Sequence, residues 1–119
     1  MKIFDCTTFY NEKMMMDVRF NVLDQYVSKF IVVESTFSHS GKKKELNFNI
    51  DDYPKFKDKI IYLVIDHEPK ELIKEENLEL DSISKRLNSL KRIEQSYDNM
   101  IKGIDEAKED DLILLSDND

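Results

Sequence analysis

Two carboxylates spaced two residues apart follow the last apolar run of the chain. Residues 112–115 (Leu-Ile-Leu-Leu) lead directly into Ser116, Asp117, Asn118 and Asp119. Side chains at i and i+2 of an extended chain point to the same side, so the two carboxylates would lie about 7 Å apart. Such anions repel each other unless a cation lies beside them, and a hard divalent ion such as Mg²⁺ or Mn²⁺ fits that place. A solvated acidic segment is the alternative interpretation.

Other common arrangements of catalytic residues are missing from the sequence. His39 and His67 are far apart and have no Cys or His at zinc-ligand spacing, so we expect both at the surface. Cys6 is expected to be buried, and no Ser/His/Asp or Cys/His set can be assembled with it. The chain has two glycines and no Gly-rich phosphate loop, which argues against P-loop and dinucleotide-binding sites.

One short β-type run and three apolar runs predict β-strands. They lie at residues 2–6, 30–33, 60–65 and 112–115. The last three are uninterrupted, which is typical of strands that are covered on both faces in a parallel sheet.

Two stretches have helical periodicity. The first runs from Glu12 to about Val27, with Asn11 as a plausible N-cap. Its apolar stripe consists of Met16, Phe20, Leu23 and Val27. The second runs from about Ser82 to Ala107, with Asp81 placed to cap it.

The resulting order β-α-β-β-α-β predicts an α/β fold with a mostly parallel sheet and helices on both faces, in three layers. Ligands in open α/β sheets bind beyond the carboxyl ends of the strands. That rule selects four short segments as candidate binding loops, namely residues 6–12, 34–40, 66–68 and 116–119.

Composition narrows the class of protein. The chain has 119 residues, with 18 Lys and Arg against 25 Asp and Glu, so its formal net charge is −7. This charge argues against a nucleic-acid partner, whose binding needs clustered cations. No apolar run approaches the roughly 20 residues of a membrane helix, and no signal-peptide pattern is present. With a single cysteine as well, we expect one globular domain in the cytoplasm.

The strand followed by Asp-x-Asp resembles the metal and nucleotide-sugar signature of glycosyltransferases of the GT-A fold. Residues 2–6 (KIFDC), 9–12 (FYNE) and 32–37 (VVESTF) extend the likeness to glycosyltransferase family 17, which includes β-1,4-mannosyl-glycoprotein β-1,4-N-acetylglucosaminyltransferases. Residues 92–104 resemble the family pattern Arg-x-x-x-Gln-Arg-Asn-x-Ile-x-x-Gly-Leu, although Asp98 stands where the family has an arginine.

The resemblance implies a GT-A-like (Rossmann-like) three-layer sandwich, incomplete at its C-terminus. It also implies transfer of N-acetylglucosamine from UDP-N-acetylglucosamine to a glycan acceptor, with Mn²⁺ or Mg²⁺. The family continues past Asp-x-Asp with Glu-Ile-Pro and an acceptor-binding half. Residues 1–119 are therefore expected to form the donor-binding half of an inverting enzyme. The general base is expected beyond residue 119, so no catalytic residue is named, and this chain alone is expected to be inactive.

The resemblance also implies a set of site residues. Those expected to bind the nucleotide-sugar are Thr7, Phe9, Asn11, Glu34, Arg92 and Asp117. The expected metal ligands are Asp119, directly, and Asp117, which leans toward the ribose or a metal-bound water.

Four of these residues also have ordinary structural interpretations. Phe9 could pack in the core and Asn11 could cap a helix. Glu34 is expected to accept hydrogen bonds from a uracil or ribose, or else to lie in water at the rim. Arg92 could pair with phosphate or line the solvent face of its helix.

Two other functions compete with this interpretation. One is a non-catalytic or degenerate module that binds a nucleotide or a partner, and the other is a family 2-like glycosyltransferase. A receiver-type signalling domain fits less well, because Asp5 lies inside the first predicted strand and no lysine follows a fifth strand.

Overall fold

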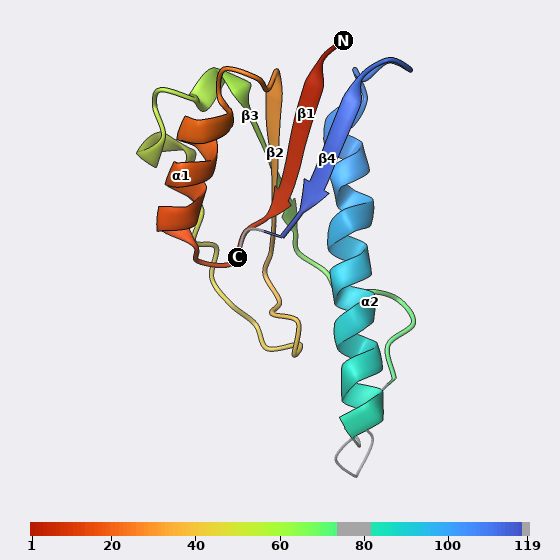
Figure 1. Cartoon of the computed structure of the whole chain (residues 1–119). Coiled ribbons are helices and arrows are strands. Elements are labelled where there is room, and N and C mark those ends of the chain that lie inside the picture. The colour runs from red at the N-terminus through yellow and green to blue at the C-terminus, as the bar shows by residue number, and fades with distance from the viewer. Residues whose placement is uncertain (74–81, 118–119) are drawn as a thin grey trace.

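The computed structural model of the chain describes residues 1–73 and 82–117 (Figure 1). The strands and helices are β1 (Ile3–Thr8), α1 (Lys13–Leu23), β2 (Lys29–Ser35), β3 (Ile60–Ile65), α2 (Ser82–Met100) and β4 (Leu112–Ser116). Short 3₁₀ turns lie at Ile50–Asp52, Lys57–Lys59 and Ile101–Ile104. No helix in the described ranges is long and apolar enough to cross a membrane.

The four strands form one parallel sheet in the order β3-β2-β1-β4. In this register Cys6 of β1 lies beside Ile31 of β2 and Leu115 of β4. Figure 1 shows α1 on one side of the sheet and α2 on the other. The predicted α/β fold with a parallel sheet is confirmed. Because the strands are parallel, their carboxyl ends lie together on one side of the sheet.

Each face of the sheet has its own apolar core. On the α1 face, Phe20 packs edge-on against Phe30 and Tyr53, with ring centroids 4.7 and 5.0 Å apart. On the α2 face, Ile31 and Met100 are fully buried. The 3₁₀ turn after α2 approaches this face closely, since a Cβ on Gly103 would lie 2.7 Å from Ile31.

Both helices are shorter than the periodicity predicts. Helix α1 ends at Leu23, although Val27 continues its stripe into the core. The predicted N-cap is wrong: Glu12 occupies that position, and its carboxylate accepts hydrogen bonds from the backbone N–H groups of Tyr10 and Asn11. Helix α2 ends at Met100 and tightens into a 3₁₀ turn. The predicted cap of α2, Asp81, lies outside the described residues.

The prediction of full burial is also wrong for β3 and β4, because these strands form the two edges of the sheet. The four apolar side chains of β4, residues 112–115, are 37 to 55% exposed. In β3, Ile60 and Ile65 are buried while Val64 is 42% exposed. An apolar run alone does not give strand order, and strand order decides which strands are covered.

One buried ion pair joins α1 to the sheet. The Arg19 guanidinium donates through Nε and Nη2 to the two Asp5 carboxylate oxygens, at 2.6 Å each. Nη2 also donates to the hydroxyl of Ser116 in β4. Because the Asp5 side chain is fully buried, the fork from Arg19 compensates a charge that water cannot reach.

We expect Arg19→Met to lower the free energy of unfolding by about 3–5 kcal/mol, because it leaves the buried Asp5 carboxylate without its charge partner. Lys57→Met is the control and should change little, since the Lys57–Asp51 pair is exposed to water. Urea unfolding followed by circular dichroism measures both. Unchanged stability of Arg19→Met would contradict the role given to this pair.

The buried thiol supplies a second test. Burial, the main cause, and the nearby Asp5 carboxylate, the second, raise the pKa of Cys6 from its usual 9.0 to about 11. The unfolded chain therefore loses this proton at a lower pH than the folded one, and stability should fall as the pH rises from about 9 to about 11. Cys6→Ala should reduce that part of the alkaline loss in urea titrations. An unchanged pH dependence in Cys6→Ala would show that the thiol makes no such contribution.

Candidate functional site

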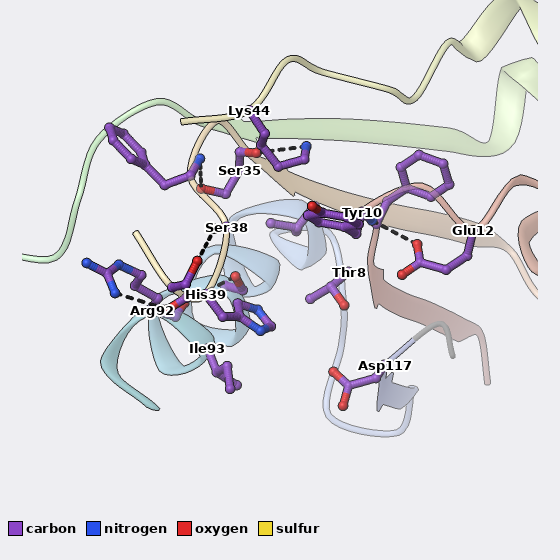
Figure 2. A pocket seen from close by; sticks show the side chains of 15 residues that line it. Thr8, Tyr10, Glu12, Ser35, Ser38, His39, Lys44, Arg92, Ile93 and Asp117 are labelled. Carbon is purple, nitrogen blue, oxygen red and sulfur yellow. Dashed lines mark hydrogen bonds between the residues drawn. The ribbon is translucent and has the colours of Figure 1, made fainter. Parts of the chain in front are cut away.

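A cavity of about 560 Å³ lies where the strands end (Figure 2). Its lining comes from the end of β1 and the loop after it, the end of β2 and the segment that follows, helix α2, and the residue after β4. Representative lining residues are Thr8, Tyr10, Ser38, His39, Arg92 and Asp117. The location agrees with the rule that ligands bind beyond the carboxyl ends of parallel strands.

The structure divides the expected site residues into two groups. Phe9, Arg92 and Asp117 line the cavity. Thr7, Asn11 and Glu34 do not belong to its lining. The expected Asp119 lies outside the described residues.

Thr8 lines the cavity in place of the expected Thr7. The predicted strand ended at Cys6, whereas β1 extends to Thr8. Alternation along the strand turns Thr7 toward the α1 face, where it is buried and donates its hydroxyl proton to the Thr8 carbonyl at 3.2 Å. Asn11 lies exposed just before α1.

Glu34 is not the rim carboxylate that its place after an apolar run suggests. It is 1% exposed, and four donors contact it. Its Oε2 accepts from Lys44 Nζ and the Asn47 N–H, both at 2.7 Å, and its Oε1 accepts from the Phe48 N–H at 3.0 Å and the Tyr62 hydroxyl at 2.6 Å. Burial, together with the bond to Glu34, raises the pKa of Tyr62. Through these hydrogen bonds Glu34 holds residues 44–48, in the segment after β2, against the sheet.

The aromatic pair at the end of β1 divides between the core and the cavity. Phe9 is buried and packs edge-on against Phe48, with centroids 5.2 Å apart, so it contributes both to the core and to the cavity wall. The Tyr10 ring is 55% exposed, and Lys44 Nζ lies 5.3 Å from its centroid. The Asn47 amide donates to the Tyr10 carbonyl at 2.7 Å and holds this loop in place.

Arg92 lies in the cavity wall with its guanidinium already occupied. Nε and Nη2 donate to the two carboxylate oxygens of Glu68 at 2.9 and 2.8 Å, and Nη1 donates to the His39 carbonyl at 3.0 Å. Its side chain is 12% exposed, so it does not line the solvent face of α2. A direct phosphate contact would compete with Glu68 for the same N–H groups.

Asp117 is the described member of the predicted metal pair. It is exposed at the end of β4, lines the cavity and accepts a hydrogen bond from the Tyr97 hydroxyl at 2.8 Å. Among residues 1–73 and 82–117, no group of three or more His, Cys, Asp or Glu side chains could hold a metal ion. The metal site stays a prediction that depends on Asp119.

His39 was expected at the surface, and the structure places it in the cavity lining as well as in contact with solvent. The strand-end rule had already selected residues 34–40, which contain it. The signal that could have identified His39 was therefore its position after β2, and not any spacing to other histidines.

The family model described as Glycosyltransferase family 17 matches residues 1–119, the whole chain. No curated protein and no solved structure matches the chain.

We expect Glu34→Gln to lower the free energy of unfolding by about 2–3 kcal/mol, because an amide cannot accept from all four donors. Tyr62→Phe removes one of these donors and should cost about 1 kcal/mol. Urea unfolding measures the stabilities, and trypsin cleavage at Lys42–Lys44 should accelerate more in Glu34→Gln. Equal cleavage rates in parent and Glu34→Gln would contradict the fastening role.

Proposed function

The chain belongs to glycosyltransferase family 17, and from this premise we propose that its cavity binds the UDP part of a sugar donor. The donor we favour is UDP-N-acetylglucosamine, and the reaction is sugar transfer to a glycan acceptor. Residues 1–119 would act as the donor-binding half of that enzyme.

The observation that carries this proposal is the position and lining of the cavity. Its volume of about 560 Å³ falls within the usual range for small-molecule sites. It combines an exposed aromatic ring, Tyr10, with the hydroxyls of Thr8, Ser38 and Ser40 and the carboxylate of Asp117. A nucleotide-sugar offers a flat base and ribose and sugar hydroxyls, which Tyr10 and the hydroxyls of this lining match. Its diphosphate carries negative charge that the proposed divalent ion would offset.

Tyr10 and Asp117 take the central roles in the proposed complex. The Tyr10 ring would stack against the base, since aromatic rings and bases offer each other flat π-faces. Asp117 would accept from a ribose hydroxyl or from a metal-bound water. Glu34 and Thr7 would act indirectly, because both are buried beneath the wall.

The Asp117 carboxylate has the donor chemistry that Mn²⁺ and Mg²⁺ prefer, so the described residues fit such an ion in part. Asp119 would be the direct ligand and Asp117 its neighbour. A bound divalent ion would neutralise the negative charge that develops on the leaving diphosphate. The protein's own part is to orient the donor and to exclude water from it.

A non-catalytic nucleotide-binding module is the second candidate, and one observation favours it. The two lining cations of fixed charge, Lys44 and Arg92, are both paired with carboxylates, so neither is free for a leaving group. Release of UDP from UDP-N-acetylglucosamine that depends on an added glycan acceptor would favour the enzyme over the module.

We expect UDP to bind the folded chain in the presence of Mn²⁺, and Asp117→Asn to weaken that binding by about tenfold. Asp110→Asn is the matched control, because Asp110 precedes the opposite end of β4 and lies outside the cavity lining. Titration calorimetry measures all three affinities. Absence of UDP binding by the folded parent with Mn²⁺ present would remove the donor-site assignment.

A further inference from the structure

One wall of the cavity is a tight turn at residues 38–41, in the segment after β2. The Gly41 N–H donates to the Ser38 carbonyl at 2.9 Å, and the Ser38 N–H donates to the Lys42 carbonyl at 2.8 Å. Gly41 has φ +89°, a conformation that side-chain-bearing residues rarely adopt. The turn therefore has a defined shape, with His39 near its tip.

Two side chains of helix α2 hold this turn by hydrogen bonds. Arg92 Nη1 and the Ser89 hydroxyl both donate to the His39 carbonyl, at 3.0 and 2.8 Å. The guanidinium also packs directly on the turn, since a Cβ on Gly41 would lie 2.4 Å from Nη2. Glu68 holds the other side of the guanidinium, so Arg92 is fixed between Glu68 and the turn.

Of the residues that line the cavity, three can carry positive charge: His39, Lys44 and Arg92. Lys44 is paired with Glu34 at 2.7 Å and Arg92 with Glu68 at 2.8 Å. Within the described ranges, the His39 imidazole has no hydrogen-bond or ion-pair partner. Figure 2 shows its ring facing the space bordered by Thr8 and Asp117.

We propose that His39 contacts the phosphate groups of the bound nucleotide diphosphate, and that Arg92 is a positioning residue that holds His39 in place. This inference rests on the proposed function, which supplies the nucleotide diphosphate as ligand. An imidazole N–H donates readily to a phosphate oxygen and does so more strongly when the ring is charged.

Arg92 affects the ligand indirectly, by fixing the turn, because its N–H groups already donate to Glu68 and to the His39 carbonyl. Moving the guanidinium onto a phosphate would leave the partly buried Glu68 carboxylate without a partner. It would also release the His39 carbonyl and the packing against Gly41. The geometry thus assigns anchoring to Arg92 and ligand contact to His39.

The first test compares the two histidines. His39→Ala should weaken UDP binding, measured with Mn²⁺ by titration calorimetry, by about tenfold. His67→Ala is the matched control and should leave the affinity unchanged, because His67 lies outside the cavity lining, next to Asp66. An unchanged affinity in His39→Ala would overturn the proposal.

The second test separates positioning from direct contact by a double-mutant cycle. Arg92→Lys keeps the charge but loses the fork, and it should weaken UDP binding severalfold in the parent and hardly at all in the His39→Ala background. Equal losses in both backgrounds would show that Arg92 acts independently of His39 and would overturn the positioning role. Glu68→Gln, which loosens the same brace, should repeat the pattern and serves if Arg92→Lys fails to fold.

A third measurement keeps the inference separate from the proposed function. Pyrophosphate is titrated into the folded parent at a constant Mg²⁺ concentration, and the two histidine rings are followed by NMR at constant pH. Movement of the His39 resonances but not those of His67 supports the contact, even if UDP itself fails to bind and the donor-site assignment falls. If neither ring moves, the proposed contact is wrong.

Discussion

Burying the carboxylate of Glu34 beneath the segment that follows β2 requires several donors to converge on it, because an uncompensated charge at 1% exposure would be very costly. Those donors come from Lys44, from the backbone of residues 47 and 48, and from Tyr62 on the neighbouring strand. The carboxylate can be satisfied only when the segment is folded back against the sheet. The cavity wall is therefore formed before any ligand arrives, which reduces the ordering cost of binding.

The second buried carboxylate, Asp5, connects the core to the other side of the cavity. Arg19 holds Asp5 and the hydroxyl of Ser116 together, so helix α1, β1 and β4 meet at one guanidinium. Ser116 directly precedes Asp117, whose direction into the cavity is also held by Tyr97. Both sides of the cavity thus depend on buried charges within the sheet.

The features that the sequence predicts well are those set by local pattern. One β-type run and three apolar runs located the four strands, and the strand-end rule selected segments that do supply cavity-lining residues, such as Tyr10, Ser38 and Asp117. The features it missed depend on residues far apart. The donors to Glu34 lie 10 to 28 residues from it in sequence, so nothing nearby distinguishes a buried acceptor from a rim carboxylate. The exposure of β4 follows from strand order, which no single run encodes.

The charge balance of the cavity bears on both the proposed nucleotide and the proposed metal. Lys44 and Arg92 are each neutralised by a carboxylate, while Asp117 and Glu12 also belong to the lining. With a formal charge of −7 on the whole chain, the cavity offers a diphosphate little attraction from its fixed charges. A diphosphate that arrives with a divalent cation carries less negative charge and gives Asp117 a partner of opposite sign. If the proposed donor binds together with a divalent ion, Asp117 would take part in both contacts, while Lys44 and Arg92 shape the wall through their carboxylate partners.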